Sequence, residues 1–518
     1  MSTTAPLVSR KTPEDLRIFL PEKIILAAIT AAYLAIALHS AYRRPFWFDE
    51  LSTLFVASTP SLRAMFHAIP ADGNPPLYFL LARFFLHLPI KLELALRFPA
   101  ILAFLFAMLT IYVFVRRIAD PVFASLAMAL FLGAHTIQYA VEARPYSLLL
   151  AFTGLTLCCW QSYCRTGKGI ALFGIWVGIV GAILSHQYGA IDATLPILVG
   201  EAVFSIRQRT IDMRPLLIIA AAVPALFLTI PPMLHGQREL LAAVRACPFA
   251  WTHPLLIDLA AYTQMLPPFF YPLVMLAALG WFLKIAISRP VSPHGPRLGC
   301  PAEDLAVALT LSLITPLIIV VSRLETGFFQ PGYAVGSAMG LAILITILLA
   351  RWRIDSPLAW TASIYCIVVG LLVLWYTPHP EATLPWSDPV LYAGPASEPI
   401  VVASALEFSP AWWYSDGSLR PRLHCLKDLG YALHHSNPTA EYSLWLERDS
   451  TPMQLDDYYN FLATHQHFLL YCFGEPRIEW IKQRLINEGW HLTLLSSAKK
   501  QPTGDDGQQY RELYQVIR

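Results

Sequence analysis

Hydrophobic residues gather in long uninterrupted runs over the first three quarters of the chain. Runs of about 18 to 22 apolar residues are long enough for an α-helix to cross a hydrocarbon core of roughly 30 Å. The pattern predicts membrane-spanning helices at residues 24–41, 98–115, 121–137, 147–163, 170–185, 188–205, 215–232, 265–287, 304–321, 333–350 and 357–376. We therefore expect a mainly α, polytopic membrane protein with about 11 spans.

One apolar stretch, from Asn74 to Ile90, is ambiguous, and the topology depends on it. Arg83 and His87 interrupt the stretch, which is also short for a span. These features favour an amphipathic helix that lies in the membrane interface. The next span then delivers the pair Arg116-Arg117 to the cytoplasm, whereas counting Asn74 to Ile90 as a span would reverse this.

Positive charges set the predicted orientation. Basic residues precede the first run, and no small-residue cleavage site follows it, so the first helix is retained with its N-terminus inside. The later basic clusters all fall on that same side when the interfacial helix is not counted as a span. The predicted domains are a cytoplasmic segment at residues 1–23, a transmembrane domain at 24–376 with its first outer loop at 42–97, and a periplasmic domain at 377–518.

Beyond Pro378 the long apolar runs give way to runs of strand length. Segments 399–406 and 467–472 read as strands, and 479–487 has a helical pattern, so we expect a small α/β domain. It has no glycine-rich phosphate loop, and we expect it to shape the acceptor side or to stabilise the membrane domain. In the periplasm, Cys425 and Cys472 could pair as a disulfide; otherwise they are structural thiols.

The overall composition argues against a water-soluble protein and against a nucleic-acid partner. The 518 residues are 56% hydrophobic and 14% charged, with a mean hydropathy of +0.51, so water is not the main solvent. The formal net charge of +2 gives no reason to expect nucleic acid as a partner. A membrane lipid environment is expected instead.

Asp49 and Glu50 in the first outer loop are the leading candidates for chemistry. They follow an aromatic trio, Phe46-Trp47-Phe48, at the expected membrane surface. Partial desolvation there raises the pKa of a carboxylate and makes it a better base. An alternative stays open: Asp49 is the N-cap of a helix that starts at Leu51, with Glu50 in its first turn.

Two further outer junctions hold polar residues on the same side. Glu142 and Arg144 could form an ion pair that only stabilises the fold. Alternatively they could form half of a site, in which Glu142 binds a metal or a sugar hydroxyl and Arg144 binds a phosphate. His186 is a candidate ligand at the next junction, although its spacing alone favours a simple interfacial residue.

Four motifs in order resemble the bacterial glycosyltransferase 39 family of the GT-C class. They are Phe46-Trp47-Phe48-Asp49-Glu50, Asp72-Gly73-Asn74-Pro75-Pro76-Leu77-Tyr78, Ala95-Leu96-Arg97-Phe98-Pro99 and Glu142-Ala143-Arg144-Pro145-Tyr146. This family includes protein O-mannosyltransferases and lipid A aminoarabinose transferases. The resemblance implies a GT-C-like helical bundle that moves a sugar, with inversion, from a polyprenyl-phosphate carrier to a lipid, glycan or protein acceptor. The reaction would take place at the periplasmic face of the inner membrane, during assembly of the cell envelope or its lipopolysaccharide.

The resemblance also implies roles for single residues. Asp49 matches the catalytic aspartate, and Asp49 with Glu142 would hold a divalent metal ion if the enzyme uses one. The substrate-binding positions expected are Glu50, Glu142, Arg144, Tyr146, His186 and Asn74. The apolar groove beside the interfacial helix would hold the polyprenyl tail.

The sequence departs from the family at Gly332, where relatives often carry an arginine before the tyrosine that is Tyr333 here. Arg323 is the nearby candidate to replace it. A rival interpretation is a membrane transporter or a flippase for lipid-linked sugars. Transporters place polar sites at the midplane between repeated halves. No repeat is visible, and Asp192 and Glu201 form no paired relay, which favours the enzyme.

Overall fold

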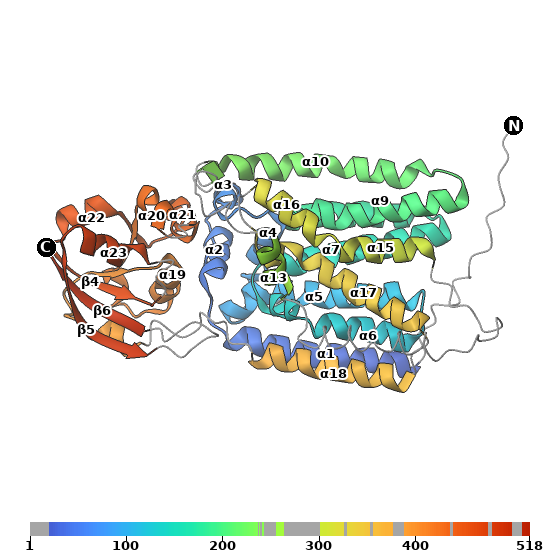
Figure 1. Cartoon of the computed structure of the whole chain (residues 1–518), viewed down its shortest axis with the longest axis horizontal. Coiled ribbons are helices and arrows are strands. Elements are labelled where there is room, and N and C mark those ends of the chain that lie inside the picture. Colours follow the sequence, from blue (N-terminus) through green and yellow to red (C-terminus); the bar gives the residue numbers. More distant parts are fainter. Residues whose placement is uncertain are drawn as a thin grey trace.

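The computed structural model describes most of the chain. The described residues are 20–236, 238, 241–242, 255–263, 301–325, 329–352, 356–376, 388–435, 439–474, 479–499 and 510–518. They form a long helical bundle, with a smaller domain of strands and helices at one end (Figure 1).

Long apolar helices build the bundle. The main ones are α1 (Leu20–Arg43), α5 (Leu92–Arg116), α7 (Tyr146–Thr166), α9 (Gly189–Gln208), α10 (Met213–Gly236), α17 (Val335–Arg351) and α18 (Ser356–Tyr376). Within the described residues, seven helices are long and apolar enough to cross a membrane, or up to nine if each of two bent pairs is one span. The apolar helix α8 (Gly169–Ser185) is shorter, and the span predicted at 265–287 lies outside the described residues. The predicted polytopic helical fold is confirmed.

Two predicted spans are broken. The span expected at 121–137 divides into α6 (Pro121–Leu132) and the 3-10 helix η2 (His135–Val141), which meet at 74°. The span expected at 304–321 divides into α15 (Ala302–Ser312) and α16 (Thr315–Glu325), bent by 43°. Pro316 explains the second break, because proline is accepted in the first turn of a helix but ends the one before it.

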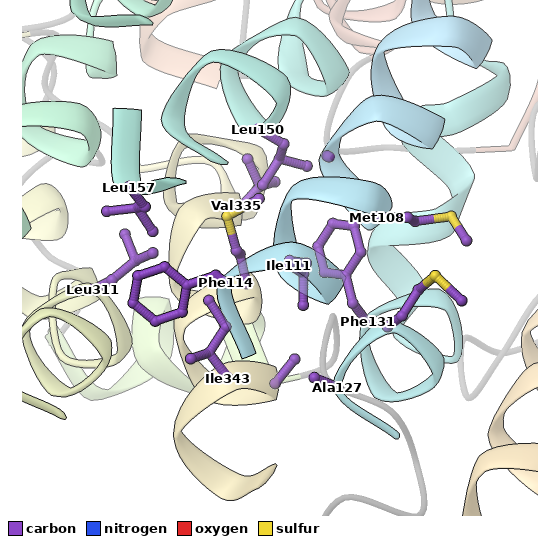
Figure 2. Close-up of a cluster of buried hydrophobic side chains, with 14 of the residues drawn as sticks. Met108, Ile111, Phe114, Ala127, Phe131, Leu150, Leu157, Leu311, Val335 and Ile343 are labelled. Carbon is purple, nitrogen blue, oxygen red and sulfur yellow. The ribbon is translucent and has the colours of Figure 1, made fainter. Parts of the chain in front are cut away.

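The centre of the bundle is an apolar core. Figure 2 shows side chains from α5, α6, α7, α15 and α17 meeting there, namely Met108, Ile111, Phe114, Ala127, Phe131, Leu150, Leu157, Leu311, Val335 and Ile343. Outward-facing positions are also apolar: on α10, Phe227 and Leu228 are 72% and 73% exposed. A helix that is hydrophobic all round suits lipid surroundings.

The first outer loop folds into three short helices, α2 (Phe48–Ala57), α3 (Leu62–Asp72) and α4 (Leu77–Phe85). With 9 residues, α4 is about 14 Å long and falls well short of a membrane crossing. The stretch from Asn74 to Ile90 is therefore not a span. In Figure 1, α2 and α3 lie between the bundle and the C-terminal domain.

The C-terminal domain contains a six-stranded sheet in the order β3-β2-β1-β4-β6-β5. Its elements are β1 (Ile400–Val402), α19 (Ala405–Tyr414), β2 (Leu423–Lys427), α20 (Leu429–His435), α21 (Thr439–Leu446), β3 (Gln454–Asp457), α22 (Tyr458–Thr464), β4 (His467–Cys472), α23 (Trp480–Asn487), β5 (His491–Lys499) and β6 (Tyr510–Ile517). The first four strands pair in parallel, and β6 pairs antiparallel with β4 and β5. The expected α/β fold is confirmed. The expected pair does not form a disulfide: Cys425 on β2 and Cys472 on β4 are free thiols, separated by β1.

This domain packs directly on the first outer loop. The Phe46 N–H donates to the Tyr414 hydroxyl at 2.7 Å, and that hydroxyl donates to Glu93 at 3.1 Å. The rings of Phe55 on α2 and Trp413 on α19 meet edge to face, with centroids 5.8 Å apart. One apolar cluster joins both parts, so the loop is held between the bundle and the domain.

Candidate active site

Asp49 lies in the first turn of α2. The helix begins at Phe48 with Trp47 as its N-cap, so the alternative that made Asp49 the cap of a helix from Leu51 is wrong. The Asp49 side chain is 31% exposed, and its Oδ2 lies 3.7 Å from Nε of Arg144. The carboxylate is therefore accessible from one side and contacts a buried guanidinium on the other.

Glu50 has a structural role that the sequence did not predict. It is fully buried, and its carboxylate pairs with Arg97 in a two-pronged contact of 2.7 Å and 2.5 Å. The backbone N–H of Ala143 donates to the same carboxylate at 2.8 Å. Glu50 was expected to bind substrate, but here it ties α2 to α5 and to the second outer loop.

Arg144 bridges the first two outer loops. Its Nη1 donates to Oδ2 of Asp72 at 2.8 Å and to the backbone carbonyl of Asp49 at 3.3 Å. Burial alone lowers the pKa of Arg144, but the charges of Asp72 and Asp49 outweigh it and raise that pKa, so the guanidinium stays charged. The structure thus brings the predicted Asp49 and Arg144 together.

Asp72 is held by donors on both of its oxygens. Besides Arg144, the Asn74 side chain donates to Oδ1 at 2.6 Å, and Ser52 lies 2.8 Å from Oδ2. Between Asp72 and Asn74, Gly73 ends α3 with φ of +82°, a left-handed conformation that glycine adopts without strain. Asn74 therefore positions Asp72 in this structure.

The C-terminal domain contributes a carboxyl group of its own. Glu447, which follows α21, lies within hydrogen-bond distance of Ser52 on α2 and is 2% exposed. Burial raises its pKa to about 8, and the nearby charge of Asp72 adds to this shift. The sequence interpretation missed this residue, because nothing in the pattern of the domain links it to a loop 395 positions away.

Aromatic side chains surround His186 behind the acidic residues. Its ring centroid lies 5.5 Å from those of Tyr146, Tyr188 and Tyr333. Burial, helped by the charge of Arg144, lowers the pKa of His186 to about 3, so the imidazole is neutral near pH 7. Nδ1 accepts from the Tyr188 N–H at 3.3 Å, which leaves the proton on Nε2.

Gly332 packs against this aromatic cluster, and its smallness has a physical reason. A Cβ at this position would lie 2.8 Å from Cζ of Tyr146 and 3.0 Å from the Tyr139 hydroxyl. No arginine side chain fits there in this conformation. The proposed substitute, Arg323, is paired with Asp258 at 2.6 Å.

The described part of the chain contains no group of side chains that makes a metal site. Among the described residues, no three histidine, cysteine, aspartate or glutamate side chains are grouped as ligands. Asp49 also faces the positive charge of Arg144, which would repel a cation. Glu142 is buried, and its charge acts on Arg44.

Comparison with known proteins agrees with this arrangement. A family model described as dolichyl-phosphate-mannose-protein mannosyltransferase matches residues 73–235. This segment is therefore similar to that family. The match covers the loop with Asn74, the Glu142–Arg144 motif and His186, and it confirms the predicted enzyme class, a glycosyltransferase.

Solved structures extend the likeness to nearly the whole chain. A crystal structure of ArnT from Cupriavidus metallidurans bound to undecaprenyl phosphate has a TM-score of 0.55 at 12% identity, covering 95% of this chain and 98% of ArnT. The apo state of ArnT gives the same TM-score and identity, covering 96% and 98%. The chain therefore shares the ArnT fold. The Archaeoglobus fulgidus oligosaccharyltransferase is more distant, with a TM-score of 0.44 at 11% identity over 94% of this chain and 73% of that one. No curated protein matches.

Proposed function

We propose that this chain transfers a sugar from a polyprenyl-phosphate carrier to an acceptor hydroxyl, with inversion at the anomeric carbon and Asp49 as the base. The proposal rests on the position of the Asp49 side chain. It is a partly exposed carboxylate at the start of α2, where the membrane bundle meets the C-terminal domain, and Arg144 lies beside it. The ArnT structure bound to undecaprenyl phosphate supports a carrier of this chemical class.

The reaction balances with one base. Asp49 takes the proton of the acceptor hydroxyl as that oxygen bonds to the anomeric carbon from the face opposite the carrier. The bond from the anomeric carbon to the carrier phosphate breaks, and its electron pair leaves on the phosphate. The released polyprenyl phosphate is a stable anion, so no general acid is required.

The other residues hold this base in place. Arg144 contacts both the backbone and the carboxylate of Asp49, and its own charge is balanced by Asp72. Because its position and its charged neighbour are fixed before the reaction, the base does not have to move into place during proton transfer. We propose a periplasmic orientation for this end of the bundle, since Arg116, Arg165 and Arg207, in the last turns of α5, α7 and α9, lie at the opposite end.

A cell-based experiment tests the proposal whatever the acceptor is. The gene is deleted, and mass spectrometry compares the envelope lipids, glycans and proteins of mutant and parent. We expect the loss of one hexose, pentose or uronic acid, which returns with the wild-type gene. Asp49→Asn should fail to restore the sugar at equal protein abundance.

Asp120→Asn is the matched control for this experiment. Asp120 is an exposed aspartate between α5 and α6, at the other end of α5 from the site. This variant should restore the sugar in full. An unchanged envelope after deletion, or restoration by Asp49→Asn, would contradict the proposed function.

A further inference from the structure

Ser52 lies between two carboxyl groups from different domains. Its hydroxyl is 2.8 Å from Oδ2 of Asp72 and also within hydrogen-bond distance of Oε1 of Glu447. A hydroxyl has one hydrogen to donate, and an ionised carboxylate can only accept. Both contacts are hydrogen bonds only if one of the two carboxyl groups carries a proton and donates it to Ser52.

The surroundings decide which carboxyl group holds the proton. Asp72 already accepts from Arg144 on one oxygen and from Asn74 on the other, so both of its oxygens act as acceptors. Among the described residues, no salt bridge joins Glu447 to a lysine or arginine, and its side chain is almost completely buried. Burial without an ion-pair partner favours the neutral acid, so the proton belongs to Glu447.

We propose that protonated Glu447 is a positioning residue of the active site, which donates to Ser52 and so couples the C-terminal domain to Arg144. The chain of contacts runs from Glu447 through Ser52 and Asp72 to the guanidinium that holds Asp49. This role rests on the proposed function, in which Asp49 is the base. It makes the C-terminal domain part of the catalytic machinery.

The electrostatics of the cluster predict when this coupling fails. The groups that face Glu447 are Asp72 and Asp49, which disfavour its ionisation, and Ser52 and Arg144, which favour it. Burial is the largest effect, and the pKa rises from 4.5 to about 8. The folded protein therefore binds this proton more tightly than the unfolded chain does. The contribution of this proton to the stability of the folded protein is therefore lost as the pH rises from 4.5 through 8.

Ionised Glu447 would leave two carboxylates competing for the single hydrogen of Ser52. Glu447, which follows α21, and Asp72, at the end of α3, then repel each other. Asp72 loses the hydrogen bond from Ser52 that helps to hold it against Arg144. Glutamine is the informative replacement, because its amide can donate to Ser52 as the neutral acid does but does not titrate. Alanine removes the contact at every pH.

The test compares Glu447→Gln, Glu447→Ala and Glu441→Gln in the full-length purified protein from pH 6 to 9.5, with undecaprenyl-phosphate sugar as donor. Glu441 is the matched control: it is a buried acid of the same domain whose pKa burial also raises to about 8, but it bonds to Trp480. We expect kcat of the wild type and of Glu441→Gln to fall above pH 8. Glu447→Gln should keep its kcat to pH 9.5, and Glu447→Ala should lose about tenfold or more throughout.

Hydrogen exchange of residues 62–72 gives a second readout that needs no transfer. After correction for intrinsic rates, protection of α3 should fall between pH 7 and 9 in the wild type and in Glu441→Gln, but not in Glu447→Gln. If Glu447→Gln behaves like Glu447→Ala, or shows the wild-type pH dependence, the positioning role is wrong. Absence of transfer in every variant, with the expected exchange pattern, would instead overturn the proposed function and leave the domain coupling standing.

Discussion

The buried pair of Glu50 and Arg97 offers a sharp test of how the site is built. Glu50 is completely buried and the Arg97 side chain is 1% exposed, so each is the main neutralising charge of the other. Breaking a buried pair by removing one partner costs about 3 to 5 kcal/mol, because a charge is left uncompensated. Glu50→Gln should therefore destabilise the protein by about that amount.

Arg97→Met should cost more. Arg97 also donates to the backbone carbonyls of Ala41, Arg44 and Pro45 at 2.6 to 2.8 Å, where the chain leaves α1. Each carbonyl left without a donor adds about 1 to 3 kcal/mol. Replacing Glu50 and Arg97 together by apolar residues should cost less than the sum of the two single changes, since no buried charge is then left alone.

Heating detergent-solubilised protein and measuring the folded fraction by size exclusion checks this order. The control is Asp449→Asn, which removes a solvent-exposed partner of Arg448 and should change stability by less than about 0.5 kcal/mol. A Glu50→Gln protein with wild-type thermal stability but no transfer would refute the reasoning. Glu50 would then act on the substrate, as the sequence pattern suggests.

Three further predictions concern the neighbouring residues. Gly332→Arg forces a side chain into Tyr146, so it should cost about 1 to 3 kcal/mol of stability and lower transfer, measured by thermal unfolding and product formation. His186 is neutral because its pKa lies near 3, so His186→Gln should leave the shape of the pH–rate profile from pH 5 to 8 unchanged; a lost acidic limb would contradict this. Cys425→Ser and Cys472→Ser should leave electrophoretic mobility without reductant unchanged, because the two thiols are free.

Hydropathy predicted the membrane helices well because burial in lipid leaves a strong signal in composition. It did not predict the breaks after Leu132 and Ser312, where the chain stays apolar on both sides of a bend. The residue pattern also placed Asp49 and Arg144 on the same face, and the structure brings them into contact. Such partners can be predicted from sequence when the topology alone places two loops on the same face.

The rest of the site depends on partners that sequence patterns do not pair. Glu50 seemed as available as Asp49, yet one position along α2 turns its side chain inward to Arg97, 47 residues away. Glu447 sits in a domain without any catalytic signature and acts only through its contact with Ser52. Long-range burial, rather than local pattern, determines what these carboxyl groups do.

Transfer by purified Asp49→Asn from a defined undecaprenyl-phosphate sugar tests the central claim most directly. The variant should fold like the wild type, since Asp49 is partly exposed, and its rate should fall by about 10²- to 10⁴-fold, as expected for loss of a general base. Asp120→Asn, measured beside it, should transfer at the wild-type rate. An Asp49→Asn protein that transfers the sugar as fast as the wild type would contradict the account.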